Sequence, residues 1–119
     1  MESRFRFDYD EEYDILYIYN AERDVEESVE VSEDVVLDFN KEDKVNGIEI
    51  FYASEFLGAF NNSIDKDFLK SLENASWEYK EFRNQWLMVV ILKSKNQVIR
   101  QPMPPLRKSE YVSPLIANS

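Results

Sequence analysis

Alternating apolar and polar residues fill most of the first half of the chain, a period typical of half-buried β-strands. Phe5, Phe7 and Tyr9 alternate with charged residues, and similar alternation runs through four further segments. These segments lie at residues 13–19, 25–31, 35–39 and 45–52. The pattern predicts five antiparallel strands arranged as a meander. The second strand, which is apolar on both faces, is expected at its centre.

The turn between the last two of these strands has two candidate positions. Asn46-Gly47 is the strongest two-residue hairpin signal, but a turn there leaves residues 41–45 without apolar alternation. Residues 41–43 are polar enough to turn the chain. We therefore expect the turn at residues 41–43 and place Gly47 within a strand or at a bulge.

The period changes after residue 60, where apolar residues recur at the spacing of one helix face. The residues of this apolar stripe are Ile64, Phe68, Leu69, Leu72 and Ala75. Ser63 can cap such a helix, and Asp65 and Asp67 fall in its first turn, where the helix dipole favours negative charge. The sequence predicts a helix near residues 63–74 packed on a sheet, with a shorter helical turn at residues 54–60.

A second β region begins at Trp77 and Tyr79 and contains the continuous apolar run from Trp86 to Leu92. Such a run is buried on both faces, either within a core or at a subunit interface. The residues after a polar turn at 93–96 return as its partner strand. All four prolines follow residue 101, so residues 102–119 are expected as an extended, loosely packed tail.

These elements predict an α+β fold: an antiparallel β-meander with one helix near 63–74 and a C-terminal β-hairpin near 86–101. A chain of 119 residues fits one domain. We place that domain at residues 1–101 and a Pro-rich tail at residues 102–119.

Charge is distributed unevenly between the two halves of the chain. The net charge is −10, and residues 1–60 carry 18 acidic and 5 basic side chains, against 6 and 9 in residues 61–119. An acidic surface repels phosphate backbones, so we expect no direct nucleic-acid binding. The acidic half is either a solvated face, a patch for a basic protein partner or a field that steers a cationic ligand.

No apolar signal core is present near residue 1, and the longest apolar run, Trp86 to Leu92, has only seven residues. That run is too short to span a membrane. We therefore expect a cytoplasmic protein without membrane contact.

The chain contains neither Cys nor His. Their absence excludes disulfides, thiolate nucleophiles, zinc sites built on sulfur and the His-paired nucleophiles of most hydrolases. A Gly-rich phosphate loop is also missing. We therefore assign no catalytic, cofactor-binding or metal-binding residue, and we expect no cofactor.

Carboxylates are the remaining candidates for chemistry. The acidic stretch from Asp8 to Asp14 fails the calcium-loop pattern, because Tyr13 and Tyr19 stand where glycine and the bidentate glutamate are required. We expect a turn there. Asp38 and Glu49 interrupt two apolar strands. A pocket joining two or three of the candidates would favour a hydrolase that is carboxylate-based or depends on a hard metal. The candidate carboxylates are Asp8, Asp10, Asp14, Asp38 and Glu49.

Two stretches resemble a known family. Residues 7–18 contain the pattern Tyr-Asp-x-x-x-Asp-x-Leu-Tyr-Ile. Residues 35–40 read Val-Val-Leu-Asp-Phe-Asn, which is similar to the family pattern Val-x-x-Asp-x-Asp except that asparagine stands at the last position. Gly-Ile-Glu-Ile-x-x-Ala-Ser follows at residues 47–54. The order and spacing resemble the family called domain of unknown function 2283, over residues 5–57. The resemblance implies an antiparallel β module with no established activity and no site residues to carry over. Residues 58–101 would extend that module with a helix and a hairpin.

Relatives in this family are often encoded beside small toxin-like proteins, which suggests an antitoxin-like role. The leading hypothesis is a small, non-catalytic, acidic protein-interaction module. A carboxylate-based or hard-metal-dependent hydrolase is the alternative, and acidic mimicry of nucleic acid is a third. Exposed sheet edges and the apolar run at residues 86–92 also predict a homodimer.

Overall fold

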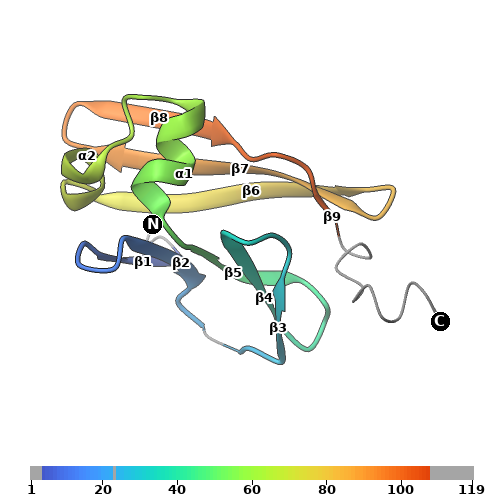
Figure 1. The fold of residues 1–119 in the computed structure, drawn as a ribbon. Helices are drawn as coiled ribbons and strands as arrows, with labels where there is room; N and C mark the ends of the chain where they lie inside the picture. The colour runs from blue at the N-terminus through green and yellow to red at the C-terminus, as the bar shows by residue number, and fades with distance from the viewer. Residues whose placement is uncertain (1–3, 23, 108–119) are drawn as a thin grey trace.

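A computed structural model describes residues 4–22 and 24–107, which form two antiparallel sheets joined by two helices (Figure 1). Sheet A contains β1 (Phe5–Asp10), β2 (Ile15–Asn20), β3 (Glu27–Glu30), β4 (Val35–Phe39) and β5 (Val45–Ile50). Sheet B contains β6 (Asn74–Phe82), β7 (Gln85–Ser94), β8 (Gln97–Pro102) and β9 (Leu106–Arg107). Helices α1 (Ala53–Phe60) and α2 (Lys66–Lys70) lie between them in sequence. The expected α+β class, dominated by antiparallel strands, is confirmed.

The strand order of sheet A corrects the predicted meander. The order is β1-β2-β5-β4-β3, so β5 lies between β2 and β4. Most residues of β5 are buried, whereas β3 exposes all but one of its residues. The strand that is best covered therefore takes the centre, and the acidic strand lies at the edge. The turn expected at residues 41–43 is confirmed, with Asp43 at φ 62°, and Gly47 lies within β5.

The helices differ from the prediction in length and position. The helix expected near residues 63–74 is limited to α2, and its cap is Asp65 rather than Ser63. The Asp65 side chain accepts a hydrogen bond from the Phe68 backbone N–H at 2.8 Å. Because β6 begins at Asn74, the chain has no room for a longer helix. The segment at 53–60, where only a helical turn was expected, forms the longer helix α1.

Sheet B contains the predicted hairpin, formed by β7 and β8. The apolar run lies in β7, which pairs with β6 on one side and with β8 and β9 on the other. The expectation that this run is buried on both faces is wrong within one chain, because Leu87 is exposed and Val89 and Ile91 are only half-buried. The expectation of a loosely packed segment after Pro102 is wrong for residues 103–107, because Met103 and Leu106 are buried. Leu106 in β9 pairs with Trp86, which anchors this segment to the core. Residues 108–119 of the predicted tail lie outside the described residues.

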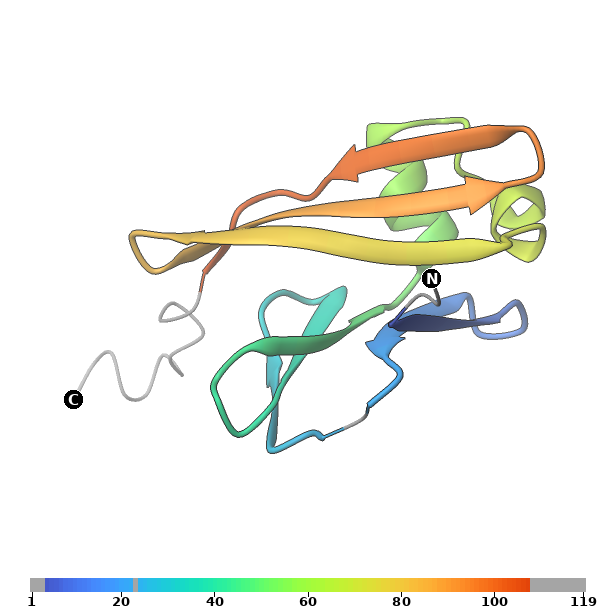
Figure 2. The same ribbon diagram turned by 180° about the vertical axis from the view of Figure 1, so that it is seen from behind.

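The core lies between the inner faces of the two sheets. Ring contacts join them: Phe39 lies 5.1 Å from Trp86 between ring centroids, and Phe5 meets Trp77 edge-on at 4.7 Å. Helix α1 covers one face of sheet B, and the view from behind shows the opposite face without a covering helix (Figures 1 and 2). Because the core lies between the sheets, each sheet also has an outer face, which points away from the core. None of the helices in the described ranges is long and apolar enough to cross a membrane.

Candidate functional site

The structure distributes the five candidate carboxylates over three places. Asp8 and Asp10 are exposed on the edge strand β1, whereas Asp14 is buried in the turn between β1 and β2. Asp38 and Glu49 lie on the neighbouring strands β4 and β5, and they are the candidates that the fold brings together. Over residues 4–22 and 24–107, no group of three or more acidic side chains could hold a metal ion.

Asp14 connects the first hairpin to the start of α1. Its Oδ1 accepts a hydrogen bond from the Tyr9 hydroxyl at 2.6 Å, and its Oδ2 accepts one from the Ser54 hydroxyl at 2.7 Å. The Ser54 backbone N–H also donates to this carboxylate, at 3.1 Å from Oδ1. The residue at the N-cap position, Tyr52, makes no side-chain capping bond. Asp14 therefore satisfies an N-terminal amide of α1 from outside the helix.

The electrostatics of this cluster keep Asp14 ionised. Burial alone would raise the pKa of the Asp14 carboxyl, but hydrogen bonds from Tyr9 and Ser54 hold that pKa below its ordinary value. The pKa of the Tyr9 hydroxyl is raised, first by burial and then by its bond to the Asp14 carboxylate. Both effects favour a fixed charged acceptor with neutral donors around it. This cluster links the first hairpin to the start of α1.

Asp38 is the centre of a second cluster, on the outer face of sheet A. It is buried, and its two carboxylate oxygens accept hydrogen bonds from the hydroxyls of Tyr17 and Ser28. Tyr17 belongs to β2, so its side chain reaches across β5 to arrive at β4. Gly47 in β5 makes room for it: a Cβ there would lie 2.9 Å from Asp38 Oδ2 and 3.2 Å from the Tyr17 ring.

Glu49 lies beside this cluster. In the register of sheet A it pairs with Tyr17 on β2 and with Val36 on β4. The pKa of the Glu49 carboxyl is raised, first by burial and then by the negative charge of Asp38. Burial disfavours the charged form of this carboxyl, and the neighbouring Asp38 carboxylate adds like-charge repulsion.

The outer face of sheet A is therefore acidic, and we call it the acidic face. Alternation and register place five carboxylates on it, together with Arg6. These carboxylates belong to Asp8, Asp10, Glu30, Asp38 and Glu49. The stacked rings of Tyr17 and Tyr19, with centroids 4.8 Å apart, lie among them. The surface combines negative charge with aromatic area.

Sequence reasoning named the central carboxylate of each cluster but missed the partners. Tyr9 and Ser54 bind Asp14, and Tyr17 binds Asp38 next to Gly47. All four of these residues lie in the stretches that carry the family resemblance. The resemblance was therefore the signal that could have identified them.

Comparison with known proteins gives one match. No curated protein and no solved structure matches the chain significantly. The family described as "Protein of unknown function (DUF2283)" matches residues 6–54. That segment includes both clusters and most of sheet A, and it ends at the start of α1. Residues 6–54 thus match the DUF2283 family, as their motifs predicted, and sheet B lies beyond the match.

Proposed function

We propose that this protein is a non-catalytic interaction module whose acidic face binds a basic segment of another protein. One observation carries the proposal: five carboxylates share the outer face of one sheet with a single arginine. The ion pairs Lys70–Glu11 and Arg100–Glu78 lie elsewhere in the molecule. A field of one sign steers a partner of opposite charge and fixes its orientation.

The contacts of the buried carboxylates favour binding over catalysis. A general acid or base must exchange a proton with a substrate that it can reach. Both oxygens of Asp38 already accept hydrogen bonds, and Asp14 is committed to Tyr9 and Ser54. These two side chains are occupied in holding strands and a helix together. Glu49 and the exposed Asp8 and Asp10 contribute further negative charge to this face.

The aromatic pair on this face refines the chemistry of the partner. The stacked rings of Tyr17 and Tyr19 lie beside Glu49 and Asp8 in the strand register. A lysine or arginine side chain placed there can contact a ring face and a carboxylate together. We therefore expect a partner segment that carries Lys or Arg. An antitoxin-like role, with a basic toxin as the partner, is of this kind.

The test compares two variants that carry the same change in charge. Asp8→Asn/Glu49→Gln removes two charges from the acidic face, and Glu55→Gln/Glu73→Gln removes two exposed charges outside it. Each variant and the original protein are used to capture partners from host lysate at low and high salt. Captured proteins are identified and quantified by mass spectrometry.

We expect one stoichiometric basic partner, held at low salt and released at high salt because screening weakens surface charge pairs. The acidic-face variant should recover at least about fivefold less of it, a loss of roughly 1 kcal/mol. The matched control should recover it unchanged. Equal losses in both variants would show a response to net charge alone and would contradict the proposal, as would the absence of any salt-sensitive partner.

A further inference from the structure

The outer face of sheet B presents apolar side chains to solvent. Leu87, Val89 and Ile91 alternate along β7 with the buried residues of the core, and Val98 on β8 lies next to them. Leu87 is 43% exposed and Val98 is 58% exposed. No helix in the described part of the chain covers this face (Figure 2). Contiguous apolar surface of this kind commonly marks an interaction site.

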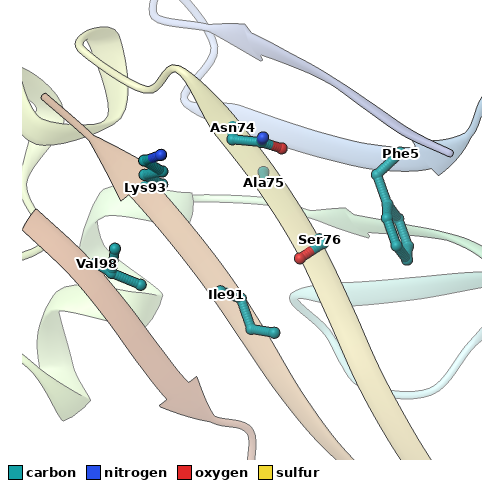
Figure 3. A pocket seen from close by; sticks show the side chains of 7 residues that line it. All are labelled: Phe5, Asn74, Ala75, Ser76, Ile91, Lys93 and Val98. Atoms are coloured by element: carbon teal, nitrogen blue, oxygen red, sulfur yellow. The ribbon is translucent and has the colours of Figure 1, made fainter. Parts of the chain in front are cut away.

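A hollow of about 340 Å³ lies at one end of this face (Figure 3). Asn74 and Ser76 line it from β6, and Ile91 and Lys93 line it from β7. The Phe5 ring forms its far side, and Val98 stands at the opposite border. The face therefore has a projecting apolar residue on the β8 side and a depression on the β6 side.

Charge on this face is mixed, in contrast to the acidic face. Glu78 on β6 and Arg100 on β8 form an ion pair at 2.6 Å, and both side chains are more than half exposed. Lys80 and Lys93 add positive charge. Two copies of a chain with net charge −10 repel each other least when they approach through the face with the fewest acids.

The geometry points to the outer face of sheet B as a self-complementary surface that binds a second copy of this chain. In a face-to-face pair with a two-fold axis along β7, β6 of one copy faces β8 of the other. In the observed register, Val98 of one copy then lies opposite Asn74, at the hollow of its partner. Arg100 lies opposite Ser76, which is two residues from Glu78 on the same face of β6. The apolar residues of β7 and the Glu78 and Arg100 charges find complements, whereas Lys93 lies opposite Lys93 of the other copy.

The area of the outer face of sheet B limits the affinity of the proposed dimer. Ten residues of β7 span about 33 Å, and three strands give a width of roughly 14 Å. The contact area is then on the order of 500 Å² per copy, at the small end for specific interfaces. The dimer is therefore reversible and depends on concentration. It directs the two acidic faces outward, so that one dimer presents two sites for the partner proposed above.

Analytical ultracentrifugation over a concentration series tests this arrangement. Leu87→Lys/Val98→Lys places two charges on the face, and Val25→Lys/Phe60→Lys places the same two charges at similarly exposed apolar residues elsewhere. We expect the face variant to raise the dimer dissociation constant at least about tenfold and the control to change it less than about twofold. Thermal unfolding verifies that both variants fold.

A charge exchange distinguishes pairing between copies from pairing within one copy. Glu78→Arg and Arg100→Glu each remove an exposed ion pair, which costs the monomer little. Each variant alone places like charges at positions 78 and 100, which are diagonal neighbours across the axis, and should dimerise more weakly. An equimolar mixture restores opposite charges and should form mixed dimers. The same two charge reversals at Glu55 on α1 and at Lys41 in the turn before β5, which are exposed but lie off the outer face of sheet B, should have no effect on dimerisation.

A chain that stays monomeric at every concentration overturns the proposal. A dimer that tolerates Leu87→Lys/Val98→Lys, or a mixture that fails to recover, shows that another surface is used and also overturns it. None of these variants changes the acidic face, so the outcome is independent of partner binding by sheet A.

Discussion

Sheets A and B share one core but bury different kinds of polar group. The buried polar residues of sheet A include the carboxylates of Asp14, at its first turn, and Asp38. Those of sheet B are Ser94 and Gln101, which carry no charge. A buried charge is stable only while its donors are in place. Sheet A is therefore held partly by charged hydrogen bonds, and sheet B mainly by apolar packing.

The outer faces of the two sheets differ in the same way, with charged groups on sheet A and apolar groups on sheet B. Sheet A presents carboxylates around a tyrosine pair, whereas sheet B presents aliphatic side chains with a balanced ion pair. Association through charge weakens as salt rises, but association of two acidic copies through an apolar face strengthens, because salt screens their net repulsion. We therefore expect salt to weaken partner binding and to favour self-association. Opposite salt responses would separate the two surfaces in one titration.

The largest expected effect comes from removing the ring that joins the sheets. Trp86 is buried on β7, and its ring lies 5.1 Å from Phe39 of sheet A. Trp86→Ala should lower the free energy of unfolding by about 3–5 kcal/mol, because it removes a large apolar side chain and leaves a cavity. Chemical denaturation, followed by the fluorescence of the remaining Trp77 and by circular dichroism, measures the loss.

The control is Phe82→Ala, at the exposed end of the β6–β7 hairpin, where we expect a loss below about 1 kcal/mol. Trp86→Ala should shift both spectroscopic transitions together, because the sheets share the core around this ring. Separate transitions for the two sheets would contradict a common core.

Local sequence patterns correctly predicted much of the secondary structure. Period-two alternation identified the strands of sheet A, and the apolar run at residues 86–92 identified β7. The chemistry of residues 41–43 correctly outweighed the Asn46-Gly47 signal, because only that turn leaves alternating residues on both sides. These features depend on neighbours along the chain, which the sequence shows directly.

Features that depend on distant contacts were missed. The place of β5 between β2 and β4 is decided by which strands cover one another, and a one-dimensional pattern does not contain that information. Asp14 and Ser54 are 40 residues apart, and Tyr17 and Asp38 are 21 apart. Met103 and Leu106 were assigned to a loose tail because nearby prolines outweighed two apolar residues in the prediction.

The next-largest effect is expected from a variant that weakens the hydrogen bonds to the Asp14 carboxylate. Asp14→Asn preserves the shape of the side chain, and Asn tolerates the left-handed backbone that Asp14 adopts at φ 57°. It removes the charge that accepts bonds from Tyr9 and Ser54. We expect a loss of about 1–3 kcal/mol at neutral pH, measured by urea unfolding. Asp8→Asn, on exposed β1, is the control and should change stability by less than about 0.5 kcal/mol.

The pH dependence of this loss has a definite sign. Because the folded pKa of Asp14 lies below its ordinary value, its contribution is present above the unfolded pKa of about 3.9. The contribution disappears as pH falls through the lower folded pKa. The difference between the original protein and Asp14→Asn should therefore shrink in acid. A difference that stays constant down to pH 2 would show that the charge is irrelevant.

A smaller effect is expected where Tyr17 crosses β5. Gly47→Ala places a Cβ against Tyr17 and Asp38, both of which are side chains that can move. We expect a loss of about 1–2 kcal/mol, because the displaced ring loses its bond to Asp38. Tyr17→Phe removes the same hydroxyl and keeps the ring. The double variant should then cost less than the sum of the two single variants. Strict additivity would mean that Gly47 is needed for another reason.

The smallest expected effect is at Glu49, where the pH dependence of stability has the opposite sign to that expected for Asp14. The pKa of Glu49 is raised by burial and by Asp38, so the folded state takes up a proton more readily than the unfolded chain. Stability attributable to this group falls as pH rises above the unfolded value of about 4.3. Glu49→Gln removes that penalty and should raise stability at pH 7 by about 0.5 kcal/mol or less, with little change near pH 4.

Urea unfolding of Glu49→Gln and Asp8→Asn at both pH values separates this local effect from the loss of one negative charge. These residues lie on either side of Tyr17 in the register of sheet A. Only Glu49→Gln should gain stability specifically at pH 7. Glu49 is partly buried beside the Asp38 charge, whereas Asp8 is exposed. Equal gains in both would assign the effect to the net charge of −10. A gain limited to Glu49→Gln means that sheet A maintains an unfavourable charge on its outer face, which a basic partner would stabilise.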